Sequence, residues 1–598
     1  MSEKNASTKV VRIGGASGFW GDSASAVPQL LKAPDLDYLT FDYLAELTMS
    51  ILSRAKAKNP ELGYAEDFVT VAMRSMLHDV DRRGIKVLSN AGGVNPRACA
   101  AALQALAKKE GVELKIAVVE GDDLTPQMEA LRAAGVRDLH SGAKLPGKLM
   151  SANAYFGALP IVEALRQGAQ IVITGRCVDS ALPLAALVHE FGWKANDYDR
   201  LAAGSLVGHL IECGPQCTGG LFTDWDQVPG WDDIGYPLVE ANADGSFVIT
   251  KPAGTGGLVT PATVAEQMLY EIGDPSAYML PDVCCDFTAV RMEQDGPDRV
   301  RVDGVRGRPP SQDYKVSATH ADGWRCSVYV TLLGGRAEAK ATRTAEAIIA
   351  RTRRMFAERG LADYRRVHSE VLGVESTFGA NSRVANNREV VLRLVVDHDE
   401  RAALELFASE IAPGAVSWAP GMANIGGGRP RPTPIVRLFS FLWPKTQATP
   451  FLTIDGATTA VAVPPIQNEL SPPKPAAVYG AQVAAAGANI ETSLLRIAHG
   501  RSGDKGDSVN IGVLARDPKW VPVLQRELTA ERVRAYFAHF VKGEVARFDV
   551  PGVHGFNFLL LGALDGGGMA SPRSDPLGKA FAQMLLDMPI RVPADLLN

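Results

Sequence analysis

The first 200 residues alternate short apolar runs with segments of helical periodicity. The runs are rich in β-branched residues, and they lie at 9–13, 36–41, 85–89, 114–119 and 169–174. Strands that are buried on both faces have this composition, because helices cover each side of a parallel sheet. Strands that alternate with helices form βαβ units. The sequence therefore predicts an α/β unit with a mainly parallel sheet and flanking helices over residues 1–275.

The remaining residues predict three further segments. Residues 276–463 alternate like antiparallel strands and then show a long amphipathic helix over 337–359, which indicates an α+β region. Prolines and alanines dominate residues 464–492, a composition typical of a linker. Residues 493–598 predict a small α/β sandwich of ferredoxin-like type. The predicted fold class is thus multidomain α/β.

Composition excludes several classes of protein. The chain has 598 residues and a net charge of -5, whereas a nucleic-acid binder carries a basic surplus. No apolar run approaches the roughly 18 residues that cross a bilayer, and the first residues lack the apolar core of a signal peptide. The seven cysteines are scattered and odd in number, which favours reduced thiols. We expect a cytoplasmic protein without nucleic-acid binding or membrane insertion.

Polar residues follow all five of the predicted strands. In open parallel sheets, ligands bind beyond the carboxyl ends of the strands. The residues at these ends that we predict to act in catalysis or substrate binding are Ser17, Gly18, Asp22, Asp42, Glu46, Asn90, Asn95, Arg176 and Asp179. Helix capping is the alternative for Asn95 and Asp179, because Asn and Asp are favoured caps. Capping alone does not explain polar residues at five successive strand ends, so we predict a site there.

The glycine-rich segment after the first strand does not have a nucleotide-binding spacing. Its glycines are spaced as GGxxGxxG over residues 14–21, whereas the dinucleotide fingerprint is GxGxxG. No Gly-Lys-Ser/Thr closes a phosphate loop of the Walker type. Backbone amides in such a segment can still hold an anion such as a carboxylate or phosphate.

A further polar group contains His209, Glu212 and Cys213. His209 is a candidate acid or base, with a structural histidine as the alternative. The spacing of His209, Cys213 and Cys217 lacks the second pair of ligands that a structural zinc site needs. We therefore predict no metal ligands from this group.

Residues 499–510 are the densest polar segment of the chain. They read as a loop between two predicted strands, and such a loop is costly to order because of its glycines and charges. A tight structural turn, shaped by Arg501, Asp504 and Lys505 pairing with one another, is one interpretation. We favour a binding site, and the residues predicted to contact substrate are His499, Arg501, Ser502, Asp504, Lys505 and Asn510.

Four segments together resemble a known family. Residues 14–22, 90–96, 174–179 and 499–510, in this order, resemble the acyclic terpene utilisation protein A family. The resemblance spans nearly the whole chain and implies a fused C-terminal ferredoxin-fold domain. It also implies a role in bacterial catabolism of citronellol- and geraniol-type terpenes, which proceeds through branched acyl-CoA esters. The resemblance transfers no set of catalytic residues to this sequence.

These observations predict an enzyme that acts on an acyl-CoA or a related carboxylic acid, as a hydratase or lyase. Asp42 and Glu46 would supply the base, Asn90 and Asn95 would stabilise an oxyanion, and His209 and Asp179 complete the predicted catalytic set. The alternatives are a non-catalytic subunit of a carboxylase-type assembly and a metal-dependent hydrolase or lyase, for which oxygen ligands favour magnesium or manganese. Apart from a coenzyme A thioester as substrate, no cofactor is indicated. We expect a small-molecule substrate and a homo-oligomer.

Overall fold

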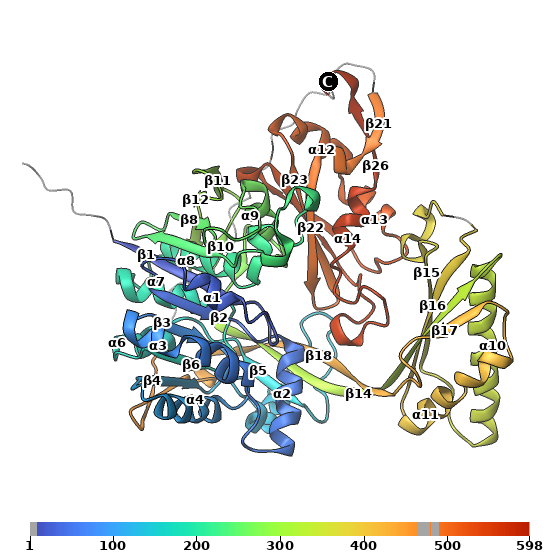
Figure 1. Cartoon of the computed structure of the whole chain (residues 1–598), viewed down its shortest axis with the longest axis horizontal. Helices are drawn as coiled ribbons and strands as arrows, with labels where there is room; N and C mark the ends of the chain where they lie inside the picture. The colour runs from blue at the N-terminus through green and yellow to red at the C-terminus, as the bar shows by residue number, and fades with distance from the viewer. Residues whose placement is uncertain (1–8, 385, 465–478, 480–488, 597–598) are drawn as a thin grey trace, which may run out of the picture.

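A computed structural model describes residues 9–384, 386–464, 479 and 489–596. Its largest element is an 11-stranded sheet (Figure 1). In spatial order its strands are β11 (Arg291–Gln294), β12 (Val300–Asp303), β8 (Phe247–Thr250), β7 (Leu238–Asn242), β1 (Val10–Ser17), β2 (Tyr38–Phe41), β3 (Lys86–Ser89), β6 (Ile171–Thr174), β4 (Ile116–Glu120), β19 (Phe451–Ile454) and β20 (Ala457–Ala460). Four of these strands follow residue 275, so distant segments extend the N-terminal sheet.

The five central strands confirm the predicted parallel arrangement. β1 pairs with β2, β2 with β3, and β6 with both β3 and β4, in each case in parallel. β7 then adds to β1 antiparallel, and β19 adds to β4 antiparallel. The carboxyl ends of five strands therefore lie along one edge of the sheet, where a ligand can reach residues from several segments.

Both faces of this sheet are covered. Successive residues of a strand point to opposite faces, and accordingly Ile171 and Ile173 belong to one apolar core whereas Val172 belongs to the other. The helices of this part are α1 (Ala26–Leu30), α2 (Glu46–Lys58), α3 (Arg74–Arg83), α4 (Pro96–Glu110), α5 (Met128–Ala133), α6 (Leu159–Arg166), α7 (Ala181–Phe191), α8 (Tyr198–Ile211) and α9 (Pro261–Met268). Burial on both faces explains the continuous apolar runs in the sequence.

A second sheet connects the large N-terminal unit to a smaller one, which we call the outer unit. Its longest strand, β14 (Asp313–Leu333), pairs with β18 (Thr433–Pro444), and the pair runs as a long arm toward the outer unit (Figure 1). Near the large sheet, β14 also pairs with β5 (Ser151–Ala154). In the outer unit β14 pairs with β16 (Glu389–His398) and β17 (Met422–Ile425), and β15 (Arg366–Leu372) pairs with β16.

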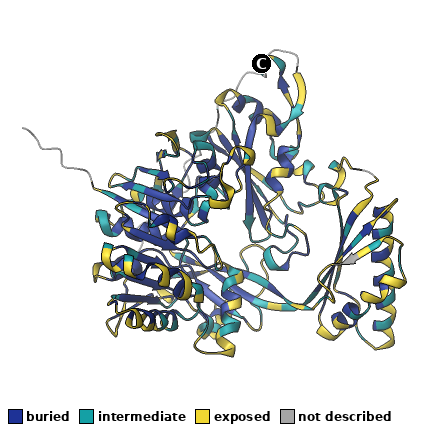
Figure 2. Cartoon of the chain, in the orientation of Figure 1, coloured by how far each residue is buried: buried dark blue, intermediate teal, exposed yellow. Residues whose placement is uncertain are grey.

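Two helices pack on the outer unit. They are α10 (Ala337–Glu358) and α11 (Arg401–Ser409), and they share one apolar core with β14 and β16. Figure 2 shows the exposed surface on the solvent side of α10. This confirms the predicted long amphipathic helix. A small three-stranded sheet of β9 (Tyr278–Met279), β10 (Cys284–Asp286) and β13 (Arg306–Arg308) lies closer to the large unit.

The C-terminal unit has a four-stranded antiparallel sheet with three helices. The strands, in order, are β22 (Ala498–Lys505), β23 (Ser508–Ala515), β25 (Gly555–Leu560) and β24 (Val545–Val550). The helices are α12 (Val521–Glu527), α13 (Ala530–Tyr536) and α14 (Phe581–Leu586), and β21 (Asn489–Ser493) pairs with β26 (Pro589–Pro593). The predicted linker over 464–492 lies largely outside the described residues.

The polar segment 499–510 is a hairpin, which corrects the predicted loop. β22 and β23 include nearly all of it, and Lys505 pairs with Ser508 across a two-residue turn. Gly506 supplies the left-handed backbone of that turn, with φ +65°. The polar residues stay ordered because they lie on strand faces that contact the rest of the chain. Among the described residues, no helix has both the length and the apolar character needed to cross a membrane.

Candidate functional site

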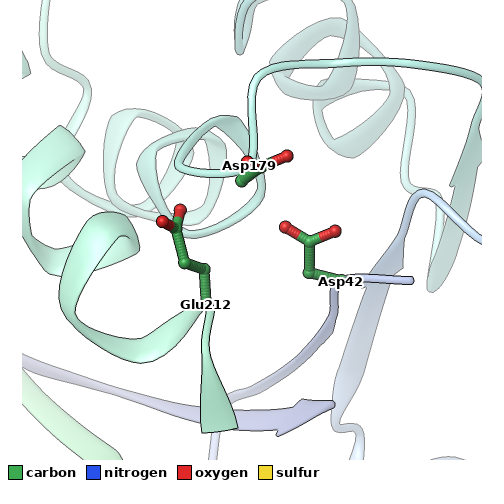
Figure 3. A group of neighbouring side chains, drawn as sticks. All are labelled: Asp42, Asp179 and Glu212. Carbon is green, nitrogen blue, oxygen red and sulfur yellow. The ribbon is translucent and has the colours of Figure 1, made fainter. Parts of the chain in front are cut away.

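Three carboxylates converge at the strand edge of the large sheet. Asp42 follows β2, Asp179 precedes α7 and Glu212 follows α8, and one oxygen from each lies within 4.8 Å of the others (Figure 3). Figure 3 shows the three side chains pointing toward one another from separate segments. We call this group the acid cluster. Asp42 is buried, whereas Asp179 and Glu212 are partly exposed.

Glycines allow these segments to come together. A Cβ on Gly15 of β1 would lie 2.5 Å from the backbone oxygen of Ile211, the last residue of α8. A Cβ on Gly208 of α8 would lie 2.5 Å from Cα of Ser180, beside Asp179. Any side chain at either position would push α8, and with it Glu212, away from the sheet edge.

Asp42 is held in place by Asn90. The Asn90 amide donates to Oδ1 of Asp42 at 2.6 Å, and the backbone N–H of Leu44 donates to the same oxygen at 3.2 Å. Burial, followed by the nearby charge of Asp179, raises the pKa of Asp42 well above its usual range. Asn90 thus positions a carboxyl group that takes up a proton more readily than an ordinary aspartate.

Glu212 has the buried side chain of His209 as its hydrogen-bond partner. Nε2 of His209 lies 3.1 Å from the backbone oxygen of Met268, which can only accept, so Nε2 carries the proton. Burial lowers the pKa of His209 to about 4, which leaves the ring neutral and Nδ1 an acceptor. Glu212 lies 3.2 Å from Nδ1, a distance at which a protonated carboxyl group can donate to the neutral ring. The raised pKa of Glu212, caused first by burial and then by Asp179, agrees with a protonated carboxyl group.

Arg176 neutralises the third carboxylate. Its Nη1 lies 2.5 Å from Oδ1 of Asp179, and its side chain is 4% exposed. The guanidinium also lies 4.2 Å from the centre of the Tyr155 ring, a cation–π contact. Arg176 is therefore a buried cation fixed at the edge of the acid cluster.

Glu46 belongs to a neighbouring charge group. The Tyr155 hydroxyl donates to Glu46 at 2.7 Å. Burial opposes ionisation of Glu46, but Lys315, Arg176 and Tyr155 outweigh it and lower its pKa to about 2. Lys315 comes from β14, and burial lowers its pKa. Glu46 therefore remains ionised, and as a weak base it is less suited to accept a proton than Asp42.

The tip of the C-terminal hairpin lies beside the acid cluster. The Lys505 ammonium lies 5.5 Å from the centre of the Tyr278 ring, and its charge helps to lower the pKa of His209. Asp504 accepts from Lys579 at 3.2 Å, and Lys579 also binds Glu271 at 2.6 Å. Burial, followed by repulsion from Glu271, raises the pKa of Asp504 to about 6. The hairpin thus adds both positive and acidic groups near the strand edge.

Other predicted site residues fasten the hairpin to the large unit. His499 lies 3.0 Å from Asp224, and the neighbouring Gly500 N–H donates to Thr223. Ser502 instead accepts from the backbone of Ala582, within the C-terminal unit. Asn510 donates to the backbone oxygen of Leu269 at 2.6 Å. The contacts of His499, Gly500 and Asn510 join the two units. Arg501 contacts the segment that follows Glu212, where it donates to the backbone oxygen of Leu221.

The remaining predicted residues also lie near the strand edge of the large sheet, and their polar groups already have hydrogen-bond partners within the chain. Ser17 donates to backbone oxygens of Phe19 and Asp42, and the Gly18 N–H donates to Asp22 at 2.8 Å. Asn95 donates to the backbone oxygens of Pro60 and Leu62. The Asn95 amide therefore holds a neighbouring loop and is not free to stabilise an oxyanion.

Sequence reasoning did not find Tyr155, Lys315, Glu271 or Lys579. Tyr155 follows β5 and Lys315 lies in β14, and only the pairing of these two strands brings both residues to the site. Glu212 appeared in the sequence beside His209, but its position facing Asp42 depends on how α8 packs. Burial raises the pKa of the Cys213 thiol, so it is a poor nucleophile.

The acid cluster also has the oxygen ligands that suit a divalent cation. Three carboxylates within 4.8 Å can bind Mg²⁺ or Mn²⁺, which prefer carboxylate oxygens. Arg176 already neutralises Asp179, and the burial that raises the pKa of Glu212 opposes the ionised form that a metal needs. Both ring nitrogens of His209 are occupied, so this residue is not available as a ligand.

Asp122 gives the protein a testable pH dependence. It is 5% exposed, and burial raises its pKa to about 7, above the value near 3.9 of an unfolded chain. The folded state therefore holds this proton more tightly, and the associated stability is present at low pH and lost as the pH rises through 7. From pH 5 to pH 8, Asp122 should lower the free energy of unfolding by about 3 kcal/mol.

Asp122→Asn should remove this contribution. One oxygen, Oδ2, accepts from Asn153 at 2.8 Å and from the Arg176 N–H at 2.9 Å, and an asparagine oxygen can do the same. Urea unfolding of both proteins at pH 5 and pH 8 measures the difference, with the exposed Asp81→Asn as control. Equal pH dependence of Asp122→Asn and the unchanged protein would contradict the assignment.

The fold and the site define a multidomain α/β protein with an acid cluster at a parallel strand edge, beside the hairpin of a ferredoxin-like domain. The model of the acyclic terpene utilisation family protein AtuA matches residues 11–454, and the model of the AtuA ferredoxin-like domain matches residues 492–591. The chain therefore belongs to the AtuA family, which is named for acyclic terpene utilisation. Comparisons with curated proteins and with solved structures gave no match.

Proposed function

We propose that the chain is a hydratase or lyase of branched acyl thioesters or related carboxylic acids, with Asp42 and Glu212 as its acid–base pair. One observation carries the proposal: Glu212 lies 3.2 Å from Nδ1 of His209 and in one cluster with Asp42. Two close carboxyl groups that share a proton supply a base and an acid in the same site. Membership of a terpene utilisation family supports the substrate class.

The elimination of water illustrates the chemistry. Asp42, as the carboxylate, takes the proton from C2 of a 3-hydroxyacyl substrate, and the C2–C3 double bond forms as the C3–O bond breaks. Glu212 gives its proton to the departing hydroxyl group, which leaves as water. The raised pKa of Asp42 makes it a stronger base than an exposed aspartate. Hydration is the reverse of these steps.

The surrounding cations have a defined role in this proposal. Arg176 lies at the acid cluster, and the positive charge of Lys505 acts on Glu212. A thioester carbonyl gains negative charge when C2 loses its proton, and fixed positive charges lower the energy of that state. We assign Glu46 to the electrostatic balance of Arg176 and Lys315, in place of the catalytic base predicted from the sequence.

A thioester panel tests the proposal. The purified full-length chain should convert at least one branched 3-hydroxyacyl-CoA or its 2,3-unsaturated counterpart, with the change in mass of one water detected by mass spectrometry. Straight-chain thioesters of equal length serve as controls for the branched substrate. No turnover in either direction across the panel would contradict the hydratase proposal.

The distances within the acid cluster also favour a second candidate, a metal-dependent lyase. In this case Asp42, Asp179 and Glu212 hold Mg²⁺ or Mn²⁺. Titration with Mn²⁺ should then raise the melting temperature, because an ion that binds only the folded state stabilises it. Asp179→Asn should abolish that increase. No Mn²⁺-dependent increase, together with full turnover after treatment with EDTA, would decide against the metal.

A further inference from the structure

A groove lies between the C-terminal unit and the segment that follows Glu212. Its volume is about 510 Å³, and it is lined by residues of the 219–234 segment, by Arg501 of β22 and by Lys579 before α14. The short stretch from Glu212 to Gly219 connects it to the acid cluster. None of the acid–base groups proposed above lies in this groove.

Large apolar side chains are exposed along the groove. Trp225 and Trp231 are 60% and 59% exposed, and their ring centres lie 5.8 Å apart. Leu221 is 68% exposed and has φ +61°, a left-handed backbone that a leucine rarely adopts. Grouped apolar side chains on a surface mark binding sites, and strained residues cluster at such sites.

Arg501 brings an unneutralised charge to the wall of this groove. It is 8% exposed, and among the described residues it forms no ion pair. Its guanidinium donates to Gln216 and to the backbone oxygen of Leu221 and lies 4.7 Å from the centre of the Tyr270 ring, while its Nε has no acceptor. A buried cation without an anionic partner is unfavourable.

A neighbouring acidic group, Glu266, does not balance this charge. Glu266 acts electrostatically on Arg501, but burial raises its pKa to about 8, so it is protonated at neutral pH. Lys579, the other cation of the groove, is already paired with Glu271 and Asp504. The charged residues that line the groove, Arg501 and Lys579, are both cations, and they lie beside an apolar wall.

We propose that this groove binds an organic anion with a flat or apolar body. The anionic group lies against Arg501, and the body packs on the indoles of Trp225 and Trp231. Guanidinium groups suit phosphates and carboxylates, and indoles stack on flat bases and pack on apolar chains. Two sources have this chemistry: the adenine nucleotide end of a thioester, and a free branched carboxylic acid. The site goes beyond the acid–base chemistry and does not depend on it.

Titration calorimetry of the full chain tests the proposal with two probes. The probes are adenosine 3′,5′-bisphosphate and a branched medium-chain carboxylate, and we expect one of them to bind. Trp231→Ala and Arg501→Gln should each weaken that binding by about tenfold or more, because each removes a stacking surface or a charged contact. Arg496→Gln, which changes an exposed arginine of the same unit, should bind normally.

The outcomes separate this site from the proposed reaction. Binding that persists in Asp42→Asn, or in a protein that turns over no thioester, supports the groove and leaves the hydratase proposal to its own test. Trp231 is largely exposed, so its replacement should leave the melting temperature unchanged, and loss of binding there cannot reflect unfolding. Absence of binding by both probes would overturn the proposal. Unchanged binding in Trp231→Ala would also overturn it. So would a change in the oligomeric mass of that variant when neither protein binds a probe.

Discussion

Asp42→Asn is expected to lower kcat by a factor of about 100 to 10,000, the usual contribution of a general base. The asparagine retains the oxygen that accepts from Asn90 and Leu44, so the local structure should persist. It lacks the carboxylate that takes the substrate proton. Steady-state turnover of the best thioester, measured for both proteins, gives the ratio.

Two comparisons keep this result interpretable. The melting temperature of Asp42→Asn should not fall, because the change removes a carboxyl group that Asp179 repels. Asp81→Asn, which alters an exposed aspartate of α3, should retain full activity. An Asp42→Asn protein with unchanged kcat would exclude Asp42 as the base.

Arg176→Gln is expected to cost about 3–5 kcal/mol of unfolding free energy, because it leaves a carboxylate without its buried partner. Arg176 is 4% exposed and pairs with Asp179 at 2.5 Å. The substitution also removes one of the positive charges that lower the pKa of Glu46. Urea unfolding at pH 7 measures the change.

A double variant separates charge from packing. Arg176→Gln with Asp179→Asn removes both charges and should recover part of the lost stability. Arg82→Gln, which removes an exposed pair with Asp79, should have a small effect by comparison. If Arg176→Gln were as stable as Arg82→Gln, Arg176 would not be a buried structural cation.

The strand-edge site could be predicted because its signal is local. Each parallel strand is a short β-branched run, and the polar residue that follows it is adjacent in sequence. Asp42, Asn90 and Arg176 were all found in this way, and the parallel order of β1, β2, β3, β6 and β4 places them along one edge. The long helix α10 was predictable for the same reason, from its own periodicity.

Residues that depend on distant pairing could not be predicted. Lys315 reaches the site because β14 pairs with β5, which lies more than 150 residues earlier. The low pKa of Glu46 could not be predicted either, since it depends on the positions of Lys315, Arg176 and Tyr155. The sequence predicts a loop over 499–510, because glycines and charges are uncommon within strands. The two paired strands that form there are ordered by contacts with the large unit, which the local sequence does not indicate.

The central claim is that Asp42 takes the proton from C2 of an acyl substrate. Incubation of a saturated branched acyl-CoA with the full-length chain in D₂O, followed by mass spectrometry, measures this step even when no water can be eliminated. We expect deuterium at C2 with the unchanged protein and strongly reduced incorporation with Asp42→Asn. Equal incorporation by the two proteins would contradict the account. So would the absence of incorporation by the unchanged protein into the saturated counterpart of a thioester that it converts.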